Sequence, residues 1–189
     1  GVFKICSCRC DFILNMKTVK QKQSEAFAVL KEKMGWTNPM QAPRLLKAVI
    51  SVGTGSLKDK KKNEVVADRL AKITGQKPAP RGAKKAIASF KTRAGDLIGY
   101  QVTLRGPRLF SFLDKLINIA FPRTKDFRGI PSKSVDEMGN ITIGVREHTI
   151  FPETADEDLR DVFGMAVTIV TAAQTRAEAL AFFEQIGIP

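Results

Sequence analysis

The residues best suited to chemistry in this 189-residue chain are clustered cations. Seven Lys and Arg residues fall within 28 positions, opposed there only by Asp96: Arg81, Lys84, Lys85, Lys91, Arg93, Arg105 and Arg108. Clustered cations neutralise phosphates, and the planar guanidinium of Arg can bind a phosphate through two hydrogen bonds. The cluster therefore predicts a surface that binds a polyanion, and RNA is the favoured one.

Glycines and one aromatic residue lie inside this cluster. Gly82, Gly95 and Gly99 would let a ligand approach the backbone closely. Phe90 could stack on a nucleobase, or it could anchor the segment to the core. A second group of lysines could bind phosphate or be a solvated helix start: Lys58, Lys60, Lys61 and Lys62.

The charge is unevenly distributed along the chain. Residues 1–152 carry 29 Lys/Arg and 12 Asp/Glu, whereas residues 153–189 carry 2 Lys/Arg and 7 Asp/Glu, so balances of +17 and −5 give the net +12. A basic body with an acidic end favours one surface for RNA and another directed away from it. The alternative is a basic surface that is merely solvated.

Residue types that support catalysis or metal binding are sparse. His148 is the one histidine, and a hydrogen-bonded structural role is favoured because the sequence identifies no partner for acid–base work. The three cysteines, Cys6, Cys8 and Cys10, lack both a fourth ligand and the spacing of a zinc site. Gly53-Thr54-Gly55 lacks the rest of a phosphate-binding motif and is interpreted as a turn. We expect no enzymatic activity, no metal and no cofactor.

Hydrophobic periodicity predicts the elements that must position these residues. Helices are predicted at residues 17–34, 60–74, 107–121 and 176–186, and strands at residues 45–52, 98–105, 141–145 and 165–171. Residues 76–97 and 123–140 are largely aperiodic, with a hairpin turn expected at Gly139-Asn140. Because strands and helices mix without a regular βαβ repeat, we expect an α+β sandwich with a mostly antiparallel sheet.

The chain length and composition favour one globular domain. Residues 1–15 are interpreted as an N-terminal extension, either disordered or an incorrectly assigned start before Met16, and residues 16–189 as a single RNA-binding domain. Residues 16–189 contain no cysteine, which fits a reducing cytosol. No stretch has 18 consecutive apolar residues, so no membrane span is expected.

Ordered blocks between residues 38 and 189 resemble the family of large-subunit ribosomal protein five, which binds 5S ribosomal RNA. They are NPMQAPR (38–44), VGTG (52–55), ITGQKP (73–78), IGYQVTLRG (98–106), AFPRTKDFRG (120–129), GN (139–140) and GVREHTIFPE (144–153). The P-R-x-x-D-F-R-G block resembles bacterial or organellar members.

The resemblance implies a cytoplasmic protein in the central protuberance of the large ribosomal subunit. Its fold would be a two-layer sandwich, an antiparallel sheet with helices packed on one side. The family's 5S rRNA contacts map onto Ser51, Gln76 and Thr103, and Ser51 stands where the family commonly has Asn. We add three neighbouring cations to this expected 5S rRNA contact set: Lys47, Lys77 and Arg105.

The resemblance also implies roles for two further segments. The basic loop with Arg81, Lys84, Lys85, Lys91 and Arg93 resembles the loop that reaches the elbow of the peptidyl-site tRNA. The segment with Ser132, Lys133 and Asn140 resembles the part facing the head of the small subunit. The implied partners are 5S rRNA, 23S rRNA, peptidyl-site tRNA, and neighbouring ribosomal proteins of the central protuberance and the small-subunit head.

Two alternatives come from other functional classes. A basic protein acting on RNA outside the ribosome, such as an RNA-modifying enzyme, would need a nucleophile, a metal set or a cofactor loop, and the sequence presents none. A protein that binds anionic membranes would need a basic amphipathic helix. Here the densest basic segment is interrupted by glycines and has little helical periodicity.

Overall fold

A five-stranded sheet forms the centre of the molecule. The computed structural model describes residues 17–55, 60–90, 92–125, 129–154 and 162–188. The strands are β1 (Leu45–Gly53), β2 (Ala79–Gly82), β3 (Leu97–Leu104), β4 (Ile141–Val145) and β5 (Met165–Thr171). Their order in the sheet is β2-β3-β1-β5-β4, and every neighbouring pair is antiparallel.

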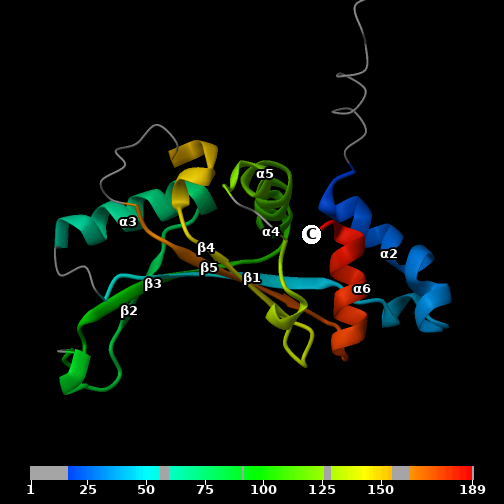
Figure 1. Ribbon diagram of the computed structural model, residues 1–189, viewed down its shortest axis with the longest axis horizontal. Helices are drawn as coiled ribbons and strands as arrows, with labels where there is room; N and C mark the ends of the chain where they lie inside the picture. The colour runs from blue at the N-terminus through cyan, green and yellow to red at the C-terminus, as the bar shows by residue number, and fades with distance from the viewer. Residues whose placement is uncertain (1–16, 56–59, 91, 126–128, 155–161, 189) are drawn as a thin grey trace, which may run out of the picture.

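The helices lie on one face and at one end of this sheet. They are α2 (Val19–Met34), α3 (Lys60–Thr74), α4 (Pro107–Lys115), α5 (Phe121–Arg123) and α6 (Arg176–Ile186). Figure 1 shows α3, α4 and α5 above the sheet, with α2 and α6 together at its right-hand end. The predicted fold class, an α+β sandwich with helices on one side, is confirmed.

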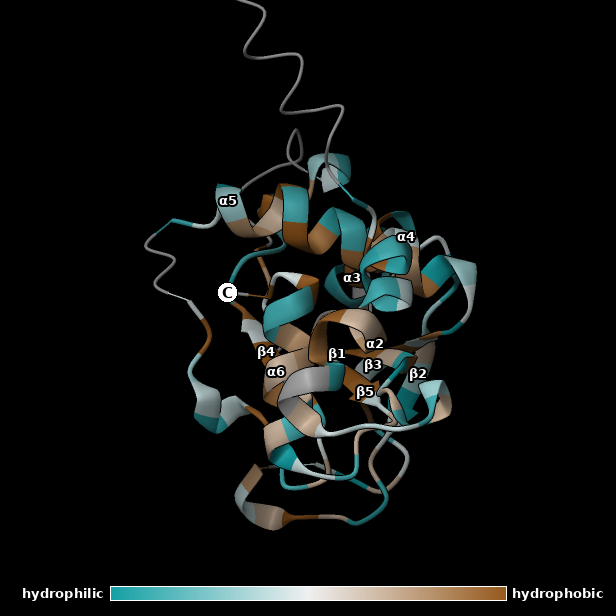
Figure 2. Ribbon diagram, turned by 90° about the vertical axis from the view of Figure 1, so that its right-hand side faces the viewer, coloured by the Kyte–Doolittle hydropathy of each residue, from teal (hydrophilic) through white to brown (hydrophobic). Residues whose placement is uncertain are grey.

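Alternation along the strands directs one set of side chains into the core. In β1 the inward residues Ala48, Ile50 and Val52 are buried, and β5 buries every second residue from Met165 to Thr171. The buried core continues through the helices, from Val19 to Ile188. In Figure 2 brown stretches are visible in the sheet near β4 and β5, and teal stretches in several of the helices. The alternating burial of β1 and β5 shows that the sheet is apolar on the face that the helices cover.

Local signals explain where several helices begin and end. The Thr175 hydroxyl caps α6 by accepting from the backbone N–H of Glu178 (3.4 Å), and the helix ends at Gly187 with a φ of 94°. α3 is followed by Gly75 with a φ of 68°, in the left-handed region that glycine favours. These positions match the helix boundaries predicted for α3 and α6.

Two elements differ from the sequence-based prediction. β2 lies in a segment that was predicted to be irregular. The sequence does not reveal this strand because all four of its residues are exposed and show no apolar alternation. The helix predicted to end before Pro122 continues to Arg123 through a π-helical turn at Leu116–Ala120. In this turn the Phe121 N–H donates to Leu116 O five residues back, and Pro122, which has no N–H, follows.

Candidate nucleic-acid interface

The sheet face opposite the helices carries small and polar residues in registered rows. One row follows the pairing of Ala79, Gln101, Ser51, Ala166 and Gly144 across all five strands. The next row follows Thr103, Val49, Thr168 and Thr142. All of these residues are exposed or half-buried. We call this surface the open face.

The open face is electrostatically suited to an anion. The five strands contain no Asp or Glu. Cations lie at its margins: Lys47 in β1, Arg81 in β2, Arg105 after β3 and Lys77 before β2. Because no strand carboxylate opposes them, a phosphate backbone across this face would meet neutral dipoles and positive charge.

Gln76 links the end of α3 to β3. In the amide orientation that satisfies both neighbours, its Nε2 donates to Thr103 O (3.2 Å) and its Oε1 accepts from Arg108 Nη1 (2.9 Å). Thr74 holds the preceding turn, since its hydroxyl donates to Leu70 O at 2.7 Å and accepts from the Gln76 N–H at 3.3 Å. The structure thus brings together Gln76 and Thr103, two of the predicted contact residues.

The remaining residues of the predicted 5S contact set lie around this pair. Ser51 is exposed on β1, paired with Gln101 and one row from Thr103. Lys47 is on the same strand and half-buried, whereas Lys77 and Arg105 are exposed. Sequence reasoning missed three polar residues of the open face: Gln101, Thr142 and Thr168. The period-two alternation of their strands could have identified all three.

The β2–β3 hairpin holds the predicted basic loop. Two bonds close its base, from the Ala83 N–H to Asp96 O (2.8 Å) and from the Gly95 N–H to Ala83 O (2.9 Å). The Asp96 carboxylate accepts from the Arg93 N–H (2.8 Å). Lys84, Lys85 and Arg93 are exposed on this loop, whereas Arg81 belongs to β2 at the edge of the open face. Lys91 and Lys58 lie outside the described residues.

Phe90 is at the outer part of this hairpin, and its side chain is 75% exposed. Ile87, near it in the loop, is 46% exposed and forms a bridge with Thr92. Of the two alternatives for Phe90, the core anchor is therefore wrong, and stacking on a base stays a prediction.

Backbone packing and conformation explain the glycines of the basic cluster, Gly82, Gly95 and Gly99. A Cβ at Gly99 would lie far inside van der Waals distance of Val52 O, and one at Gly82 would lie 3.3 Å from Gly95 O. Gly95 has a φ of 91°. Gly99 and Gly95 are therefore explained by the fold and Gly82 has little room for a side chain, so these glycines do not indicate a bound ligand.

The segment predicted to face the small subunit is attached to the end of the sheet. Ser132 and Lys133 are exposed in a 3-10 turn, and Arg176 Nη2 donates to Ser132 O (2.7 Å). A turn is present here, but it spans Asp136 to Gly139, because the Gly139 N–H donates to Asp136 O (3.0 Å), and is not centred on Gly139-Asn140 as predicted. Asn140 follows it, half-buried, with its Oδ1 inside the protein.

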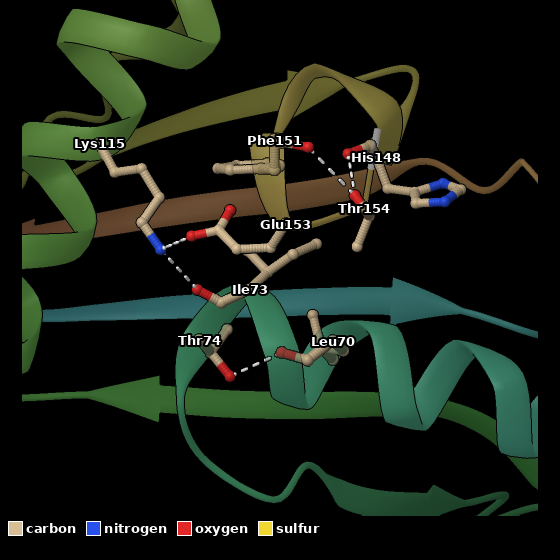
Figure 3. Close-up of polar contacts among 8 residues, drawn as sticks. All are labelled: Leu70, Ile73, Thr74, Lys115, His148, Phe151, Glu153 and Thr154. Carbon is tan, nitrogen blue, oxygen red and sulfur yellow. Dashed lines mark hydrogen bonds and ion pairs between the residues drawn. The ribbon is translucent and has the colours of Figure 1, made fainter. Parts of the chain in front are cut away.

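His148 lies on the helix side, away from the open face. It is 1% exposed, its ring stacks on Phe163 at 4.2 Å, and its Nδ1 accepts from the Phe163 N–H (3.3 Å). Figure 3 shows the Thr154 hydroxyl bonded to His148 O (2.9 Å), near the ion pair of Lys115 with Glu153. The structural role predicted for His148 is confirmed.

None of the helices in the described parts of the chain is long and apolar enough to cross a membrane. Within those same parts, no three His, Cys, Asp or Glu residues are grouped as metal ligands would be. The cysteines at positions 6, 8 and 10 are outside them. The one-sided sheet and its cation-bordered open face define a class, the α+β nucleic-acid-binding proteins.

Comparison with known proteins narrows this class. The model of the C-terminal part of the ribosomal L5 family matches residues 97–189, and that of "Ribosomal protein L5" matches residues 38–93. The large ribosomal subunit protein uL5 of Halothermothrix orenii is 45% identical over 171 residues, which cover 90% of this chain and 96% of that protein. That of Natranaerobius thermophilus is 41% identical over 174 residues, 92% of this chain and 97% of that protein. The chain belongs to the ribosomal protein L5 family.

Proposed function

We propose that this chain holds a loop region of 5S rRNA against the open face of its sheet. Its family makes it a structural, RNA-binding protein of the large ribosomal subunit in the cytoplasm, with a role in translation. One observation carries the finer proposal: in the part of the chain that the structure describes, no helix covers the open face of the sheet, and its five strands contain no carboxylate. A polyanion can lie on such a face without like-charge repulsion.

The proposed contact residues are of two kinds: uncharged polar residues that form specific hydrogen bonds with the RNA, and cations that bind its phosphates. Ser51 and Thr103 offer hydroxyls from neighbouring strands, and the Gln76 amide donates to the backbone oxygen of Thr103. Lys47, Lys77 and Arg105 at the margin pair with phosphates. A hydroxyl at Ser51 supplies one donor and its lone pairs, fewer than the amide that the family commonly has there.

Two exposed segments contact other parts of the ribosome in this proposal. The β2–β3 hairpin reaches the elbow of the peptidyl-site tRNA through Lys84, Lys85, Lys91 and Arg93. The segment with Ser132, Lys133 and Asn140 faces the head of the small subunit and its proteins. The rest of the basic surface contacts 23S rRNA and the neighbouring proteins of the central protuberance.

A titration tests the proposal. Purified protein is titrated with 5S rRNA and with a scrambled RNA of equal length and composition, over a series of salt concentrations. We expect markedly tighter binding to 5S rRNA at physiological salt and a steep fall in both affinities as salt rises, because bound cations release counterions. Equal affinity for the two RNAs would leave only a general polyanion binder and would refute the specific claim.

A further inference from the structure

The open face continues past β1 onto β5 and β4, where none of the predicted contact residues lies. Val49 of β1 pairs with Thr168 of β5, and Thr168 pairs with Thr142 of β4. Thr103 is the neighbour of Val49 on the other side. Three strand spacings of about 4.8 Å each separate Thr103 from Thr142, which gives roughly 14 Å. That width is enough for more than one nucleotide of an extended strand.

The two threonines present a hydroxyl pair to solvent. Thr142 Oγ1 lies 3.1 Å from Thr168 Oγ1, and either can be the donor. When one hydroxyl donates to the other, the second still has an O–H to donate, and both keep acceptor lone pairs. Valine would suit the strands equally well, because its side chain is β-branched like that of threonine. Threonine adds a cross-strand hydrogen bond that valine cannot make, and the donor and acceptor groups not used in that bond remain for a ligand.

The surroundings leave this pair accessible to a large ligand. Gly144 and Ala166 pair with each other in the adjacent row and have almost no side chain. A Cβ at Gly144 would meet nothing within 4 Å, so no packing contact requires a glycine there. No carboxylate lies on β4 or β5, so a phosphate beside the pair would meet no opposing charge from these strands.

We infer that the Thr142–Thr168 pair is a second polar contact point for RNA, which binds ribose 2′-hydroxyls of the segment held at Thr103. This inference rests on the proposed 5S rRNA function and extends its footprint across the whole sheet. A ribose 2′-hydroxyl is both a donor and an acceptor, so it can accept from the remaining O–H of the threonine pair or donate to a lone pair of either threonine oxygen. The pair thereby contributes to the choice of RNA over DNA.

The test compares two double variants of the full chain. Thr142→Val with Thr168→Val removes both hydroxyls and keeps the branched shape, whereas Thr142→Ser with Thr168→Ser keeps both hydroxyls. We expect the valine variant to bind 5S rRNA about five- to ten-fold more weakly, as for one lost neutral hydrogen bond. The serine variant should stay within about two-fold of the unmodified chain, and both should unfold at nearly its temperature, since the sites are on the surface.

Two further measurements separate this inference from the proposed function. Site-by-site 2′-deoxy substitution of the RNA should weaken binding to the unmodified chain at one or two nucleotides, and those same substitutions should have little effect on the valine variant. If the valine variant binds 5S rRNA normally while Thr103→Val binds it weakly, the footprint ends at β1 and the inference is wrong. An unmodified chain without preference for 5S rRNA would refute the proposed function and this inference together.

Discussion

The predicted 5S rRNA contact residues are of two kinds. Outward residues expose a side-chain hydroxyl to solvent, and positioning residues form hydrogen bonds that fix neighbouring residues. Thr103 and Ser51 point outward from neighbouring strands, whereas Gln76 is bonded to the Thr103 backbone and to Arg108. The loss of an outward hydroxyl should therefore change binding alone. The loss of Gln76 should also loosen the connection between α3 and β3.

Thr103→Val tests the outward class. We expect the loss of the hydroxyl to cost about 1–3 kcal/mol of 5S rRNA binding, the scale of one specific polar contact in a buried interface. The dependence of affinity on salt should keep its slope because no charge is removed. Thr103→Ser, measured beside it, should retain most of the affinity. Normal binding by a folded Thr103→Val variant would remove Thr103 from the contact set.

Gln76→Ala tests the positioning class. Two hydrogen bonds of the amide are lost, so we expect about 1–2 kcal/mol of lost folding stability together with weaker 5S rRNA binding. Arg108→Ala should reproduce part of the loss of binding, because Gln76 Oε1 orients the Arg108 guanidinium. Thermal unfolding and RNA titration of the same samples would measure both effects. Weaker binding with unchanged stability would show that Gln76 is a direct contact only.

Sequence patterns could predict part of this residue-level account. The alternation of Val102, Thr103 and Leu104 is enough to predict that the Thr103 side chain points away from the core. Gln101, Thr142 and Thr168 follow the same rule, but only strand pairing shows that they share a surface with Ser51. Gln76 owes its position to a bond with the backbone of a distant strand, which no local pattern encodes.

At the scale of elements, the hairpin between β2 and β3 differs from the sheet that carries it. Backbone bonds close its base, but the side chains from Lys84 to Phe90 are exposed. Removing their charges should therefore cost little folding stability. Under the proposed function, this hairpin contacts tRNA and the sheet contacts 5S rRNA, so the two contacts should be separable by mutation.

The combined variant Lys84→Ala, Lys85→Ala and Arg93→Ala tests this division. It should bind 5S rRNA within about three-fold of the unmodified chain, since Arg81 at the sheet edge is retained and the loop lies beyond the open face. Ribosomes carrying the variant should hold peptidyl-site tRNA less well, because three phosphate contacts are lost together. A charge-neutral control, Ala86→Ser in the same loop, should alter neither measurement.

Either of two results would contradict the division. One is the loss of 5S rRNA by the variant, which would make the hairpin part of the 5S site. The other is normal tRNA occupancy on variant ribosomes, which would mean that the loop charges are only solvated.

Element prediction succeeded where a buried face left a periodic pattern. α3 was predicted at its observed bounds, because Val66, Leu70 and Ile73 form a regular buried stripe. β2 was missed because an exposed edge strand that contains Pro80 has no buried face to mark it. The π-helical turn after α4 depends on how the helix packs, which the sequence alone does not define.

On the scale of the whole molecule, the fold separates the core from the charge. The helices and the inner face of the sheet bury one continuous core, and the other face is left to small and polar residues with cations around it. The composition predicted a polyanion partner from a net charge of +12. Only the strand order β2-β3-β1-β5-β4 shows that residues far apart in the sequence, such as Lys47 and Thr168, lie on the same face of the sheet.

The central claim is that 5S rRNA lies on the open face, and one matched pair of variants tests it most directly. Gln101→Glu places a carboxylate on that face beside Ser51 with almost no change in shape. Gln174→Glu makes the same change at an exposed position after β5. Because phosphate repels a carboxylate in contact with it, Gln101→Glu should weaken 5S rRNA binding at least about ten-fold, and Gln174→Glu should leave it within about two-fold. Equal affinities for the two variants would place the RNA elsewhere and contradict the account.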